Sequence, residues 1–179
     1  GGGTGGGTVG DAQLITGGTL SSFLFTPGGS FNGPTLVGND LSIAGSINRN
    51  TATNNFLVVA LSQIQLSPVK VDGLTLGIFT AGSANPTPQF YPILSTADGD
   101  GSIVSLSVNE GTDPIPTQAW VQGAGTTGGI TINSISQDSA NLTFDFDGLV
   151  PNPEVAGNEA TGTFSTSGTV DVQFGPVLP

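Results

Sequence analysis

The residues with the clearest chemical potential are two aspartates in the stretch Thr96-Ala-Asp-Gly-Asp-Gly-Ser-Ile103. Asp98 and Asp100 stand two positions apart and are followed by glycine, as in the middle of a calcium-binding loop. The pattern departs from that loop at its twelfth position, where Ser107 stands in place of a bidentate acid. The sequence therefore favours an Asp-Gly turn between two strands. A weak external Ca²⁺ site at Asp98 and Asp100 stays open as the one possible cofactor.

A second pair of acids, Asp145 and Asp147, shares one face of an expected strand, opposite Leu142, Phe144 and Phe146. Paired carboxylates serve acid–base chemistry or bind cations. A strand whose outer face meets solvent produces the same spacing, and we favour that interpretation. A secreted hydrolase that uses this pair is the remaining enzymatic alternative.

The sequence offers little for nucleophilic catalysis. It contains no histidine to act as a base and no Gly-x-Ser-x-Gly turn. Lys70 lies three positions from Ser67, and this odd spacing on a strand directs the two side chains to opposite faces. The glycines of residues 1–7 lack the lysine that completes a phosphate-binding loop. We therefore expect a protein that is not an enzyme.

Composition narrows the environment and the partners. Only Arg49 and Lys70 oppose 13 acids, which gives a net charge of −11. This balance argues against nucleic acids and anionic membrane surfaces, which require clustered cations. Cysteine and methionine are absent and charged residues make up only 8% of the chain, which suits an extracellular or cell-surface location. No apolar segment reaches the roughly 18 residues of a membrane span.

Alternating apolar and polar residues predict strands along most of the chain. The pattern is clearest at residues 41–47, 102–108, 142–147 and 170–174. The continuous apolar run at 56–61 predicts a central strand covered on both faces. Gly- and Pro-rich turns separate these runs from further candidates at 20–25, 64–71, 74–80, 90–94, 118–122, 130–135 and 161–166.

Many short strands with such turns predict an all-β fold, an antiparallel β-sandwich or a sandwich-like, jelly-roll type barrel. We divide the chain into an extended glycine-rich N-terminal segment, residues 1–16, and a single β-sandwich domain, residues 17–179. The two large amphipathic aromatics, Trp120 and Tyr91, are too few for a stacking platform and are expected to pack in the core or under loops.

The stretch GGGTGGGTVG at residues 1–10 and the late pair Gly162-Thr-Phe-Ser and Thr169-Val-Asp-Val-Gln-Phe resemble two extracellular groups. In glycine-, serine- and threonine-rich β-sandwich surface lipoproteins, a lipidated cysteine precedes a glycine-rich tether, and the cysteine is absent here. The chain also resembles fibre subunits that pass an N-terminal strand to the next subunit. Neither resemblance supplies site residues.

The glycine-rich start distinguishes these alternatives, since a tether is mobile whereas a donated strand is held by backbone hydrogen bonds to its neighbours. We expect a non-enzymatic structural protein, a subunit of a surface filament or pilus-like fibre that assembles with copies of itself by strand donation. Val9, Leu14 and Ile15 are the predicted assembly residues, with Leu14 on the strand face opposite the other two. The alternative is a surface-anchored binding module for a glycan or a protein.

Overall fold

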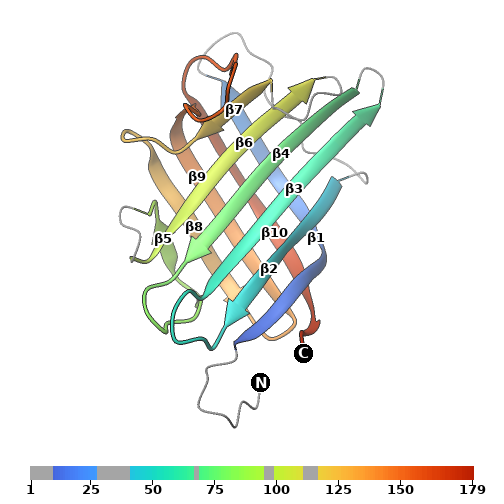
Figure 1. Ribbon diagram of the computed structural model, residues 1–179, viewed down its shortest axis with the longest axis vertical. Coiled ribbons are helices and arrows are strands. Elements are labelled where there is room, and N and C mark those ends of the chain that lie inside the picture. Colours follow the sequence, from blue (N-terminus) through green and yellow to red (C-terminus); the bar gives the residue numbers. More distant parts are fainter. Residues whose placement is uncertain (1–9, 28–40, 67–68, 95–98, 111–116) are drawn as a thin grey trace.

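The computed structural model describes residues 10–27, 41–66, 69–94, 99–110 and 117–179, and these form strands without any helix (Figure 1). The all-β prediction is confirmed. No helix of the described residues is long and apolar enough to cross a bilayer. The ten strands are β1 (Asp11–Pro27), β2 (Leu41–Arg49), β3 (Phe56–Leu66), β4 (Val69–Phe79), β5 (Phe90–Pro92), β6 (Gly101–Glu110), β7 (Gln118–Val121), β8 (Thr127–Ile135), β9 (Ser139–Pro151) and β10 (Phe164–Val177).

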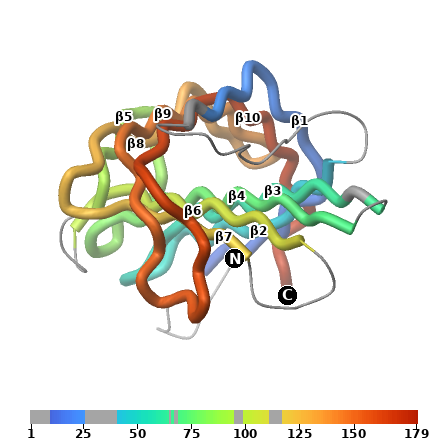
Figure 2. The backbone as a smooth tube through the Cα atoms, turned by 90° about the horizontal axis from the view of Figure 1, so that it is seen from above, coloured from blue at the N-terminus to red at the C-terminus, as the bar shows by residue number. Residues whose placement is uncertain are grey.

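The strands form one antiparallel sheet in the order β10-β1-β2-β3-β4-β6-β7-β9-β8-β5. Strand β10 also pairs with β9, so the sequence of pairings returns to its start. Seen from above, the sheet has two facing walls (Figure 2). We call β2, β3, β4, β6 and β7 the front wall and β1, β10, β9, β8 and β5 the back wall. The core lies between them.

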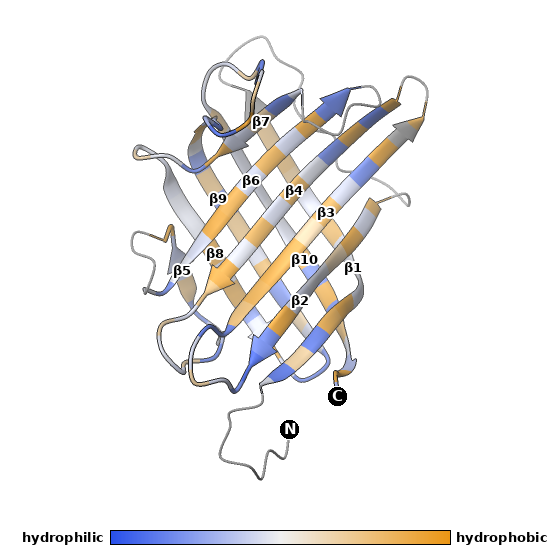
Figure 3. Cartoon of the chain, viewed as in Figure 1, coloured by the Kyte–Doolittle hydropathy of each residue, from blue (hydrophilic) through white to orange (hydrophobic). Residues whose placement is uncertain are grey.

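Period-two alternation places every second side chain in this core, and the colours along β4 and β6 follow the alternation (Figure 3). Register aligns the inward residues of the front wall in level rows. The rows are Ile43, Leu61, Leu74 and Leu106; Gly45, Val59, Leu76 and Val104; and Ile47, Leu57, Ile78 and Ser102. The back wall faces them with Ile130, Ile132, Ala140, Leu142, Phe144, Phe146, Val170 and Val172.

Two details of the strand predictions are wrong. Residues 64–71 are not one strand, because β3 ends at Leu66 and β4 begins at Val69, with Pro68, which has no backbone N–H to donate, between them. The run at 56–61 is central, but only its inward residues are buried, and Phe56, Val58 and Ala60 are half-buried on the outer face. The rings of Phe56 and Phe79 lie with centroids 6.3 Å apart, so these two outer apolar side chains partly cover one another.

Three aromatic rings join the two walls. Trp120 of β7 is fully buried, and its ring centroid lies 4.6 Å from that of Phe164 on β10 and 5.9 Å from that of Phe25 on β1. Phe25 and Phe164 stack with centroids 4.8 Å apart. Tyr91 is buried as well, so the core packing expected for Trp120 and Tyr91 is confirmed.

A polar clamp holds the end of the sheet nearest the start of β1. Gln13 is 2% exposed and donates from Nε2 to the carbonyl of Gln137 at 2.8 Å. Arg49 donates from Nη1 to the carbonyl of Ser136 at 2.8 Å and from Nη2 to Oε1 of Gln13. Its guanidinium lies 5.4 Å from the ring centre of Phe174. Partial burial lowers the pKa of Arg49, but a guanidinium stays charged in proteins.

The predicted division between residues 16 and 17 falls inside β1, which runs without interruption from Asp11 to Pro27. Residues 11–14 pair with residues 49–46 of β2, and Gln13 and Ile15 begin the pairing with β10. Residues 11–16 therefore belong to the chain's own sheet, and residues 1–9 lie outside the described part.

Gly45 marks the point on β2 where pairing with β1 stops. Its φ is 138°, and a Cβ there would lie 2.0 Å from the carbonyl oxygen of Val58. We expect Gly45→Ala to lower the free energy of unfolding by about 2–3 kcal/mol in urea titrations. Gly125→Ala is the matched control, since no atom lies within 4 Å of the position that its new methyl group would take. Equal stability of the two variants would contradict the view that only glycine fits at position 45.

Candidate functional site

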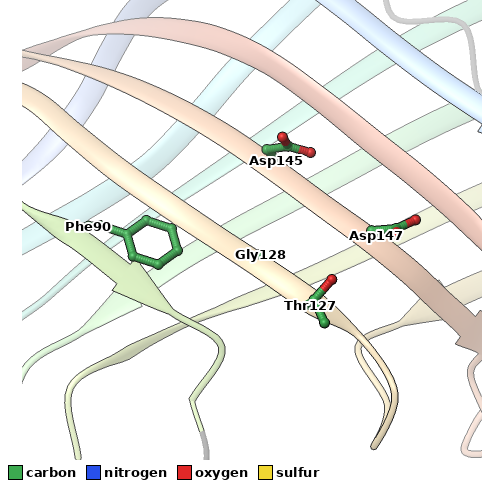
Figure 4. A pocket seen from close by; sticks show the side chains of 5 residues that line it. All are labelled: Phe90, Thr127, Gly128, Asp145 and Asp147. Atoms are coloured by element: carbon green, nitrogen blue, oxygen red, sulfur yellow. The ribbon is translucent and has the colours of Figure 1, made fainter.

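A shallow hollow of about 280 Å³ lies on the outer face of the back wall, where β5, β8 and β9 run side by side. Phe90, Thr127, Gly128, Asp145 and Asp147 line it. Figure 4 shows Phe90 on β5, Thr127 on β8 and the two aspartates on β9. We call it the Phe90 hollow.

The alternation of β9 brings the two aspartates to this surface. Phe144 and Phe146 point into the core and are fully buried, whereas Asp145 and Asp147 are exposed. The prediction that the pair lies on a solvated strand face is therefore confirmed. The hydroxyl of Ser165 on the adjacent β10 donates to the Asp147 carboxylate and helps to orient it.

Phe90 is the residue that sequence reasoning missed. Its side chain is 55% exposed, while the next residue, Tyr91, turns into the core and is 1% exposed. The Phe90 ring lies against Gly129, where a Cβ would come within 3.0 Å of ring atom Cζ. The signal was present in the adjacent aromatics Phe90 and Tyr91, because neighbours on a strand face opposite sides.

The Phe90 hollow is negatively charged, because neither of the chain's two cations lines it. Arg49 belongs to the polar clamp. The Lys70 ammonium lies 3.4 Å from the carboxylate of Asp72, and the two side chains are 18% and 1% exposed. No basic side chain among the lining residues therefore neutralises Asp145 and Asp147.

A second hollow of about 330 Å³ lies farther along β9. We call it the Val150 hollow; it is lined by Val121, Gln122, Gly123, Val150, Asn152, Pro153 and Glu154. The turn between β7 and β8 separates the two hollows, and Thr126 Oγ1 fixes this turn by donating to the carbonyl of Gly148 at 2.8 Å. Gly148 has a φ of 79°, which allows Leu149 to turn inward while Val150 stays on the outer side.

The Lys70–Asp72 pair lies near the start of β4, on the same strand face as Leu74. Gln63 of β3 pairs with Asp72 and is 7% exposed. Lys70 is therefore engaged in a polar end of the core, and Ser67, whose odd spacing from Lys70 argues against a catalytic pair, lies outside the described residues. The sequence indicates this placement of Lys70, because residues 70, 72 and 74 alternate along one strand and therefore share a face.

The predicted metal and assembly residues are only partly described. Asp100 is exposed and accepts a hydrogen bond from the backbone N–H of Ala81 at 2.5 Å, while Asp98 lies outside the described residues. Within the described ranges, no group of three or more metal-ligating side chains occurs. Leu14 is 53% exposed and Ile15 is 7% exposed, on opposite faces of β1, and Val9 is not among the described residues.

Comparisons with protein-family models, with curated proteins and with solved structures return no match to this chain. The geometry of its surfaces therefore carries the functional argument.

The hydrogen bond from Ala81 gives Asp100 a structural role, because it links the residue before β6 to the segment that follows β4. We expect thermal melts in millimolar CaCl₂ and in EDTA to coincide. A calcium-dependent rise in Tm that Asp98→Asn and Asp100→Asn both abolish would instead establish the Ca²⁺ site. Asp138→Asn, at an exposed turn, controls for the change in net charge.

Proposed function

We propose that the chain is a non-enzymatic, extracellular binding module of sandwich-like architecture that binds a glycan at the Phe90 hollow. The observation that carries the proposal is the exposed Phe90 ring beside two exposed carboxylates, all on paired strands. Rigid strands hold such groups in fixed geometry, which reduces the entropy lost on binding.

A saccharide matches this combination of groups. The C–H face of a sugar ring packs on an aromatic ring, and its hydroxyls donate hydrogen bonds to carboxylates. The outer face around the hollow continues with hydroxyl and amide side chains that lie on β8, β9 and β10: Thr131, Asn133, Asn141, Thr143, Ser165, Ser167 and Thr169. A protein partner would instead be expected to meet an apolar centre, and Phe90 is the one large exposed apolar residue among those that line the hollow.

The same two carboxylates support binding better than hydrolysis. Asp145 and Asp147 are both exposed on one strand, so they share one solvated environment. Catalytic carboxylate pairs need different environments to divide the roles of acid and base. The low fraction of charged residues and the absence of cysteine and methionine support an extracellular setting.

Phe90→Ala tests the proposal directly. Pull-downs with insoluble cellulose, chitin, chitosan and xylan first identify the polysaccharide that the protein binds, and titration calorimetry with its oligomers then gives the affinity. We expect Phe90→Ala to weaken this affinity about tenfold, because a stacked ring contributes about 0.5–1.5 kcal/mol beyond its buried area. Leu24→Ala is the control, since Leu24 is 64% exposed on β1. Binding that is unchanged in Phe90→Ala, or absent for every polysaccharide, would refute the proposal.

A fibre subunit remains the second candidate function, with donation limited to residues 1–10. Its support is an open stretch of β2: among the described strands, residues 41–45 pair only with β3. An added strand there would gain backbone hydrogen bonds along an existing edge. Residues 11–16 are engaged in the chain's own sheet and would not be donated.

Deleting residues 1–10 tests strand donation. If residues 1–10 are donated, the full chain forms filaments visible by electron microscopy at high concentration, whereas the truncated chain stays a folded monomer by light scattering. Val9→Asp should act like the deletion, because a charge would replace the expected apolar anchor, whereas Leu14→Ala should leave assembly unchanged. Filaments from the truncated chain, or none from the full chain, would exclude this candidate.

A further inference from the structure

We infer that the glycan is a chain of amino sugars with free ammonium groups, and that it extends from the Phe90 hollow to the Val150 hollow. This inference rests on the proposed function, because it names the class of glycan that the same site would take. Three features carry it: the charge of both hollows, the aromatic ring beside that charge, and the alignment of the hollows along β9.

Charge is the first feature. The Phe90 hollow holds Asp145 and Asp147, and the Val150 hollow holds Glu154, while neither is lined by a cation. The chain as a whole carries −11. A glycan with carboxylates or sulfates would be repelled, and a neutral glycan would leave the acids without a counter-charge. A protonated amine gains from each carboxylate it approaches.

The ring strengthens the same preference. Phe90 on β5 and Asp145 on β9 flank β8 in Figure 4, and both line the same hollow as Thr127. The face of an aromatic ring is negative and attracts an ammonium group, so the ring and the carboxylates favour the same charge. A sugar ring stacked on Phe90 with an amine directed toward β9 would use both interactions at once.

Alignment of the hollows extends the ligand beyond one sugar. Asp147 and Val150 lie three residues apart on the outer side of β9, at most about 10 Å, since Gly148 with its φ of 79° interrupts the extended backbone between them. Because the two hollows have no lining residue in common, a ligand that occupies both must be a chain of sugar units. The segment between β7 and β8 includes Gly123, Ala124 and Gly125, which carry at most a methyl side chain. Val121, Val150 and Pro153 offer an apolar floor beyond it.

The test uses three oligosaccharide series that share one β-1,4-linked backbone and differ at C2: cello-oligosaccharides with a hydroxyl, chitin oligosaccharides with an acetamide and chitosan oligosaccharides with an amine. Titration calorimetry is carried out where the amine is protonated, at low salt and at about 0.15 M ionic strength. We expect chitosan oligomers to bind at least tenfold more tightly than the other two at low salt. The preference should shrink as salt is added, and affinity should rise from the dimer to the tetramer.

Variants separate the contributions of charge and ring. Asp145→Asn with Asp147→Asn should reduce chitosan affinity to the level of the cello-oligosaccharides, because the amides keep the shape and lose the charge. Asp138→Asn with Glu110→Gln removes the same charge at exposed residues that line neither hollow and should leave the preference intact. Glu154→Gln should weaken the tetramer and not the dimer. Phe90→Ala should weaken all three series.

Each outcome is decisive. Equal affinity for the three series, with Phe90→Ala still weakening them, would overturn the amino-sugar inference and leave the proposed function standing. No saccharide binding, or binding insensitive to Phe90→Ala, would overturn both. Oligolysine is the competitor that represents a basic peptide. If it binds more tightly than the chitosan tetramer and depends on the same aspartates, the site takes a basic peptide and the inference is wrong.

Discussion

The closure of the sheet depends on β1, because this strand alone connects the front wall to the back wall at one side. Its first residues pair with β2 and its remainder pairs with β10, so it leaves one wall and joins the other within a single strand. Gln13 and Arg49 fasten this crossing to the turn between β8 and β9. Without it, the core between the walls would open along its length.

Glycine makes that crossing sterically possible. At Gly18, a Cβ would lie 2.1 Å from the carbonyl oxygen of Asp171, so β1 approaches β10 more closely than any side chain allows. Gly45 has a similar role on β2, since a Cβ there would lie 2.0 Å from the carbonyl oxygen of Val58, next to the last residue that pairs with β1. Glycines at these two positions thus serve close backbone approach within the sheet.

Local alternation was enough to predict most strands and the buried face of β9, since a half-buried strand has apolar and polar residues in alternation. It was not enough for β1, whose glycines at 17 and 18 interrupt the apolar pattern and whose first residues were assigned to a leader. The Phe90 hollow escaped prediction for a different reason. Phe90 lies more than 50 positions before Asp145, and only the pairing of β5 with β8 and of β8 with β9 brings them together. Such long-range register has no local signal.

The distribution of charge favours the proposed ligand binding over the alternative of a fibre subunit. Both cations are engaged within the fold, Arg49 in the polar clamp and Lys70 with Asp72, so the outer surface is left to the acids. Copies of such a chain repel one another, and a fibre would have to overcome that repulsion at every junction through backbone pairing and a few apolar anchors. A basic or polyhydroxylated ligand meets no such cost. The internal use of its only two cations therefore makes this chain better suited to capture a ligand than to assemble with itself.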